Sequence, residues 1–108
     1  MQAKSPTQGQ SNASEVHLHN PLFPLGMICA TPGALQAMVL HAIDATELLS
    51  RHQSGNWGEL CNADQRENER AVEQGSRIVS SYRIGSVTLW IITEYDRTVT
   101  TILLPEEY

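Results

Sequence analysis

Hydrophobic and polar residues alternate with a period of two over the last quarter of the chain, Ile78 to Leu104. This alternation is typical of β-strands whose two faces meet different surroundings. Gly85-Ser86 interrupts the pattern as a two-residue loop with glycine first, which favours a tight hairpin. That hairpin pairs Ile84 with Val87, so the pattern predicts two antiparallel strands in a known register.

A second hairpin follows, because Glu94 to Arg97 reads as a four-residue loop that pairs Thr93 with Thr98. The three strands then form a meander with two apolar faces. One face is expected to receive the helices and consists of Ile78, Tyr82, Ile84, Val87, Leu89, Ile91, Ile102 and Leu104. The other face is expected to leave an exposed apolar patch, a candidate binding surface of Trp90, Ile92, Val99, Thr101 and Leu103. We expect this patch to be covered by the first strand, by the apolar side of the third helix or by a second subunit.

The segment before the meander predicts one short strand and up to three helices. Residues 25–30 are apolar and bounded by prolines, which suits a buried strand. Thr31-Pro32 is a typical helix start, and an apolar stripe of Leu35, Met38, Val39 and Ala42 follows at helical spacing. Asp44 to Glu47 has the form of a capping box for a second helix that carries Leu48 and Leu49 inward and stops at Gly55. From Asn62 a polar surface helix runs to Gly75. Trp57, in the connector between the second and third helices, is expected to plug the core.

These elements predict an α+β fold with one N-terminal strand, two or three short helices and a C-terminal three-stranded antiparallel meander. The length of 108 residues fits one domain, which we place at residues 20–108. Residues 1–19 are small and polar and are expected to form a disordered tail. His17 and His19 end that tail at a spacing compatible with a metal, but no third ligand is near, so no metal site is expected.

Composition narrows the function classes. The net charge of −5 argues against a nucleic-acid partner, which would need a basic surface. The sequence has no apolar run long enough to span a membrane and no signal-peptide pattern, so we expect a cytoplasmic protein. Cys29 and Cys61 do not match a metal or redox motif and are expected to be free thiols. No cofactor-binding loop occurs, so no cofactor is expected.

One set of residues could carry chemistry. Glu94 and Arg97 at the hairpin tip, together with Arg51 and His52 at a helix end, resemble the acid–base and charge-stabilising groups of small ribonucleases. The alternative is that the tip residues only make the turn and His52 favours the helix end by its charge.

Four segments carry a resemblance to a family of short proteins encoded on bacterial plasmids and integrative elements. They are Arg51–Gly58, Asn68–Ala71, Gly75–Tyr82 and Trp90–Tyr108. The resemblance covers about residues 22–108 and implies no activity, so it transfers no functional residues. Some members bear labels linking them to type I restriction-modification. This chain does not support the label, because it lacks a Gly-rich cofactor loop and has Leu22 where an amino-methyltransferase motif has a second proline.

Two hypotheses follow. The first is a non-enzymatic binding or regulatory protein of a mobile genetic element, for example one directed against host defence, that binds an unknown protein or itself. The second is a small ribonuclease-like enzyme with its site at the hairpin tip. A structure separates them, because the enzyme requires Arg51, His52, Glu94 and Arg97 to lie together.

Overall fold

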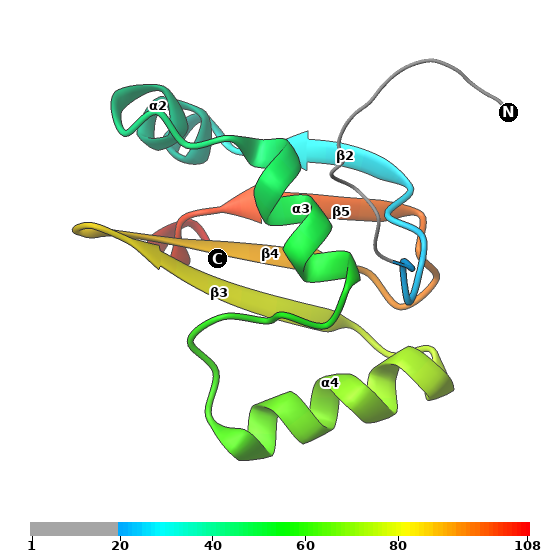
Figure 1. Ribbon diagram of the computed structural model, residues 1–108. Helices are drawn as coiled ribbons and strands as arrows, with labels where there is room; N and C mark the ends of the chain where they lie inside the picture. Colours follow the sequence, from blue (N-terminus) through cyan, green and yellow to red (C-terminus); the bar gives the residue numbers. More distant parts are fainter. Residues whose placement is uncertain (1–19) are drawn as a thin grey trace, which may run out of the picture.

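The computed structural model describes residues 20–108, so the predicted tail and its two histidines lie outside the described residues. The described chain is α+β, as predicted. Its elements are β2 (Met27–Ala30), α2 (Pro32–Leu40), α3 (Ala45–Gln53), α4 (Asn62–Gln74), β3 (Ile78–Ile84), β4 (Val87–Thr93), β5 (Val99–Leu103) and a short 3-10 helix, η1 (Pro105–Glu107). In Figure 1, α3 crosses one face of the sheet while α4 lies beside β3.

The sheet has four strands rather than the three of a pure meander. Its order is β2-β5-β4-β3, and β2 runs parallel to β5. An N-terminal strand was predicted at residues 25–30, but as a buried one, and this is wrong because β2 is an exposed edge strand. Its pairing with the last strand of the chain was not predicted. The sheet is therefore mixed, with β2 and β3 at its two edges.

The first hairpin has the predicted register throughout, with Ile84 opposite Val87. The second register is wrong by two residues, since Thr93 lies opposite Thr100 and not Thr98. The loop is longer because the Asp96 carboxylate accepts hydrogen bonds from the backbone and hydroxyl of Thr98, and Arg97 adopts a left-handed φ of 61°. A shift of two keeps every side chain on its predicted face.

The helix starts follow the predicted caps for α2 and α3. The Thr31 hydroxyl accepts from the Ala34 amide at 3.2 Å, and the Asp44 carboxylate accepts from the Thr46 amide at 2.9 Å. For α4 the N-cap is Cys61, without a side-chain bond, and not Asn62 or Asp64. The helix ends as predicted at a left-handed Gly75.

The apolar stripe predicted for α2 is wrong in most of its members. Met38 is buried, but Leu35 and Val39 are exposed and Ala42 lies beyond the helix with a φ of 52°. The helix faces the sheet with Ala34, Ala37 and Met38 instead. Two alanines allow the helix to approach the sheet closely, so the larger side chains are left outside.

The core forms on the predicted inner face of the sheet. Tyr82, Leu89, Ile91 and Ile102 pack there with Leu48 and Leu49 of α3 in the larger of two clusters. Trp57 is buried in the second cluster with Phe23, Ala71 and Ile78, which confirms the predicted plug.

The β3 edge of the sheet is closed by groups from the connector and from α4. Asn68 donates to the Val79 carbonyl at 2.7 Å, and its side-chain oxygen accepts from the Val79 amide at 3.2 Å. Next to it, the Ser81 amide donates to the Trp57 carbonyl at 3.0 Å and the Glu59 amide donates to the Ser81 carbonyl at 2.7 Å. These bonds satisfy the outward backbone groups of an edge strand.

Candidate functional site

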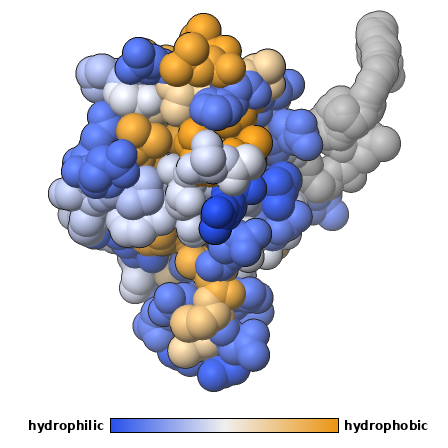
Figure 2. All heavy atoms as spheres, turned by 90° about the vertical axis from the view of Figure 1, so that its left-hand side faces the viewer, coloured by the Kyte–Doolittle hydropathy of each residue, from blue (hydrophilic) through white to orange (hydrophobic). Residues whose placement is uncertain are grey.

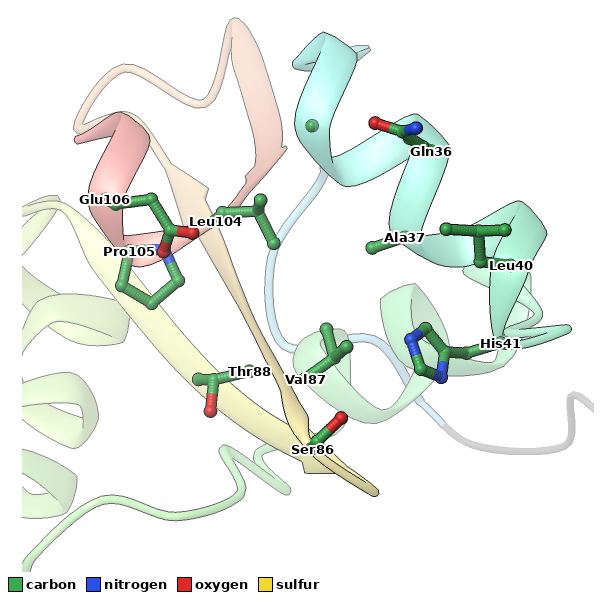
Figure 3. Close-up of a pocket in the computed structure, with 11 residues that line it drawn as sticks. Gln36, Ala37, Leu40, His41, Ser86, Val87, Thr88, Leu104, Pro105 and Glu106 are labelled. Carbon is green, nitrogen blue, oxygen red and sulfur yellow. The ribbon is translucent and has the colours of Figure 1, made fainter.

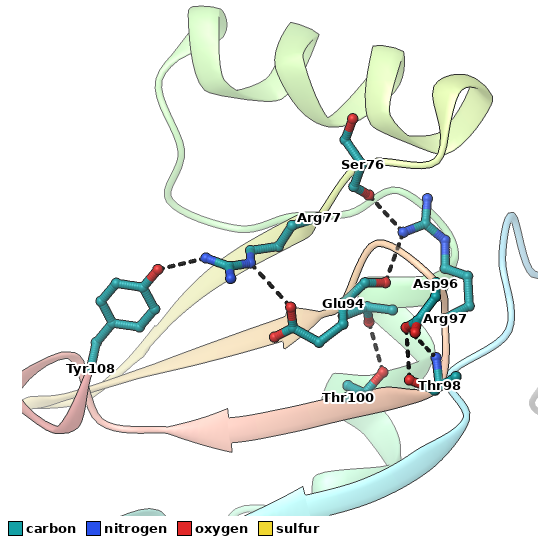
Figure 4. Close-up of polar contacts among 9 residues, drawn as sticks. Ser76, Arg77, Glu94, Asp96, Arg97, Thr98, Thr100 and Tyr108 are labelled. Atoms are coloured by element: carbon teal, nitrogen blue, oxygen red, sulfur yellow. Dashed lines mark hydrogen bonds and ion pairs between the residues drawn. The ribbon is translucent and has the colours of Figure 1, made fainter.

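The hairpin tip is held by Arg97, whose guanidinium binds backbone carbonyls. It donates to Ala71 at 2.8 Å, to Ser76 at 2.6 Å and to Glu94 at 3.1 Å, and Figure 4 shows it turned toward the end of α4. The Ala71 carbonyl belongs to the last turn of α4, where a positive charge is favourable. Arg97 therefore joins the hairpin to the helix.

The other members of the predicted catalytic set have separate surroundings. Glu94 pairs with Arg77 at 3.4 Å across the outer face of the sheet. Arg51 lies over the ring of Tyr82, 4.6 Å from its centroid. His52 belongs to α3 and is fully buried. His52 and Arg97 both contact the ring of Phe23. No hydrogen bond or ion pair joins the four side chains to one another, so the ribonuclease-like arrangement is not observed.

His52 instead starts a chain of buried hydrogen bonds through the core. Its Nδ1 lies 2.5 Å from the Ser80 hydroxyl and its Nε2 lies 2.9 Å from the Thr93 hydroxyl. Thr93 lies 2.7 Å from the Thr100 hydroxyl, which donates to the Leu25 carbonyl at 2.7 Å. The four side chains of this His52 network come from α3 and all three meander strands, and none is exposed.

The direction of the protons in the His52 network follows from its last member. A threonine hydroxyl has one proton, and Thr100 gives it to Leu25, so Thr100 must accept from Thr93. Thr93 must then accept from Nε2–H of His52, and Nδ1 accepts from Ser80. This arrangement needs a neutral imidazole. Burial, and to a smaller extent the positive charge of Arg97, lowers the pKa of His52 from 6.5 to about 4.

The Ser80–His52 pair has the geometry of a nucleophile and its base, but it has no access to solvent. Both side chains are fully buried between the sheet and α3. A substrate therefore has no path to the Ser80 oxygen, and the network acts to position α3 on the sheet.

The predicted Trp90 surface is largely covered by the chain itself. Ile92 is 4% exposed and Leu103 is 5% exposed, while Trp90, Val99 and Thr101 are half-buried. The ring of Tyr108 meets Trp90 edge-on at 5.7 Å, and its hydroxyl accepts from Arg77 at 2.6 Å (Figure 4). Tyr108 of the C-terminal segment, which was not among the expected covers, thus covers part of Trp90. Trp90 still lines a pocket of about 470 Å³ beside α4.

A different apolar surface is exposed, on α2. Val39 is 80% exposed and Leu40 is 72% exposed, and Leu35 is exposed on the same helix. Figure 2 shows hydrophobic side chains gathered over this helix at the top of the molecule. We call Leu35, Val39 and Leu40 the α2 surface. Sequence analysis placed two of these residues in the core.

The α2 surface continues into a pocket of about 490 Å³. Figure 3 shows α2 forming one wall, with the hairpin turn and the C-terminal segment opposite. Leu40 and Ala37 line it from the helix, and Val87 and Leu104 line it from the sheet side. His41 and Glu106 add one imidazole and one carboxylate to the rim. Polar residues such as Gln36, Ser86 and Thr88 also line the pocket, so it can take an apolar side chain of a partner that makes polar contacts as well.

Comparisons with known proteins find no matching family model, no matching curated protein and no matching solved structure. Among residues 20–108, no three His, Cys, Asp or Glu side chains lie close enough to hold a metal ion. In the same part of the chain, no helix has the length and apolar character needed to cross a bilayer. Cys29 and Cys61 are free thiols, both exposed.

Proposed function

We propose that this chain is a small cytoplasmic accessory protein of a mobile genetic element, without catalytic activity, that binds another protein through the α2 surface. The observation that carries the proposal is the exposure of Val39 and Leu40 on a helix that is apolar on all sides. A helix of this kind is normally buried on all sides, so its outer face is expected to meet a partner.

The pocket beside α2 supports the same role. Interfaces gain most of their affinity from a few side chains that fill hollows at their centre. Leu40, Ala37 and Val87 give the hollow apolar lining next to the exposed helix face. A partner helix or loop with one large apolar anchor fits this arrangement.

Charge is consistent with a contact at this place. The chain has a net charge of −5, yet residues 20–43 contain no Asp, Glu, Lys or Arg. The α2 surface is therefore uncharged and needs no costly desolvation of charged groups when it is covered. The resemblance to proteins of plasmids and integrative elements supports the biological setting.

Site-specific photo-crosslinking tests the proposal. A benzoyl-phenylalanine at position 39 is expected to give one dominant protein adduct in a bacterial host, and Leu40→Glu in the same chain should remove it. Tyr95 is the matched control, since it is also apolar and exposed but lies at the hairpin tip. The same adducts at positions 39 and 95, or no effect of Leu40→Glu, would contradict a binding role of α2.

A further inference from the structure

The two edges of the sheet differ in a way that points to a partner for one of them. The β3 edge is closed by Asn68 and by residues 57–59. At the β2 edge, no strand among residues 20–108 pairs with the outer side of β2. Natural proteins protect such an edge with charges, proline or a bulge. The sequence of β2 is Met-Ile-Cys-Ala and has none of these.

The backbone groups available at this edge follow from the parallel pairing with β5. The Met27 amide donates to Thr98 at 2.8 Å and the Thr31 amide donates to Ile102 at 3.0 Å. Alternate residues of a strand point their backbone groups to the same side. Residues 27, 29 and 31 therefore face β5, and Ile28 and Ala30 direct one N–H and one C=O each away from the sheet.

We infer that β2 pairs with β2 of a second copy of this chain, antiparallel across a two-fold axis at Cys29. In this register Ile28 lies opposite Ala30 of the second copy, and Ala30 lies opposite Ile28. Each strand has two outward N–H groups and two outward C=O groups. In the antiparallel pattern these eight groups form four hydrogen bonds between the two copies. The result is one continuous sheet through both copies.

Other symmetric registers use the edge less well. Centring the axis on Ile28 brings Gly26 into the ladder, but its φ of 68° is far from an extended strand. Centring it on Ala30 brings in Pro32, which has no N–H to donate. Only the register centred on Cys29 satisfies both outward residues with extended partners.

The side chains and charges of this region are also compatible with a second copy. Met27 is 65% exposed and Ile28 is 50% exposed, so pairing removes apolar surface from water. Two chains of charge −5 repel one another, and the uncharged segment 20–43 is where they can approach with the least repulsion. The residues of this edge are distinct from Val39 and Leu40, so the inference is independent of the proposed function.

Proline at position 28 gives a selective test. The Ile28 amide does not bond to β5, so Ile28→Pro leaves the sheet of the single chain intact while it removes one donor of the second-copy pairing. Ile28→Val is the matched control, because it keeps the amide and the β-branched shape. Ile28→Lys is a second disrupting variant, since it places two like charges near the axis. Far-UV circular dichroism and urea unfolding verify that each variant is folded.

Sedimentation velocity over a wide concentration range is the first measurement. We expect the wild type and Ile28→Val to reach twice the mass of a single chain at high concentration. Ile28→Pro and Ile28→Lys should weaken the association of the two copies by at least about tenfold, a loss of about 1.4 kcal/mol or more. A wild type that stays monomeric overturns the inference, including the case in which residues 1–19 occupy the edge.

Crosslinking reports the register. Opposed residues of a non-hydrogen-bonded antiparallel pair have Cα atoms about 4.5 Å apart, a separation compatible with a disulfide. In Cys61→Ser, diamide should join Cys29 to Cys29 of the second copy, accepting two hydrogens as the S–S bond forms. Cys29→Ser, which keeps only Cys61, should not crosslink, and Ile28→Pro should slow the Cys29 reaction about tenfold or more. A dimer that is unaffected by Ile28→Pro, or that crosslinks through Cys61 alone, overturns the proposed pairing.

Discussion

Acid should destabilise this protein well above the pH at which carboxylates titrate, because His52 is buried in a neutral form. Its pKa falls from 6.5 to about 4 on folding, owing first to burial and second to the charge of Arg97. The unfolded chain therefore binds a proton at His52 between these two values and the folded chain does not. By linkage, the free energy of unfolding falls as the pH is lowered through this window.

The magnitude follows from the width of the window. Each pH unit costs about 1.4 kcal/mol for one proton bound only by the unfolded state. Lowering the pH from about 6.5 to 5 should therefore reduce the free energy of unfolding by about 2 kcal/mol. Asp96 and Glu107 also have lowered pKa values, from hydrogen bonds to Thr98 and Thr31 respectively. Their effect has the same sign, but it begins only below about pH 4.5, so it does not overlap this range.

Urea unfolding at a series of pH values measures this slope. We expect His52→Gln to be less stable at neutral pH, because Ser80 and Thr93 lose their partner, and to lose the slope above pH 5. His41→Gln is the control, since His41 is an exposed imidazole near the end of the preceding helix. A wild type whose stability is flat between pH 7 and 5, or a slope that survives in His52→Gln, would refute the assigned role of burial.

Three further predictions concern the edge, the connector and the C-terminal segment. Asn68→Ala should cost about 2–4 kcal/mol in urea unfolding, because both backbone groups of Val79 lose a partner, whereas Asn68→Asp, which keeps the acceptor, should cost less. Gly58→Ala should cost more than Gly75→Ala, since both have left-handed φ values but the new Cβ at position 58 meets a backbone oxygen at 2.0 Å and that at 75 meets nothing; equal losses would contradict this. Glu107→Gln should speed hydrogen exchange of the Gly33 amide in the first turn of α2, which donates to the carboxylate, and unchanged exchange would exclude this contact as a clamp.

The meander was predictable because its signals are local. The two-residue turn fixed the first register, and alternation fixed the faces even though the second register was shifted by two residues. The same alternation places Ser80, Thr93 and Thr100 on the inner face, and buried hydroxyls require partners. His52 lies one helical turn after Leu48, on the face predicted to be buried. These two patterns together would have predicted the His52 network.

The errors concern choices that the local pattern leaves open. The helix α2 is apolar all round, so periodicity cannot distinguish the face with Ala34 and Met38 from the face with Leu35 and Val39. The packing distance to the sheet decides, and this is a tertiary property. Similarly, no local pattern indicates that Tyr108 returns over Trp90, because the contact joins residues far apart in the chain.

The parallel pairing of β2 with β5 has a consequence for how the chain folds during synthesis. β2 and α2 leave the ribosome early, but the strand that pairs with β2 is the last one made. The side chain of Thr31 is bound by Glu107, 76 positions later. Contacts of such long range slow folding, since the chain must close a large loop before it gains them. Until then the uncharged segment 20–43 exposes its apolar residues, and a nascent chain in that state is prone to aggregate.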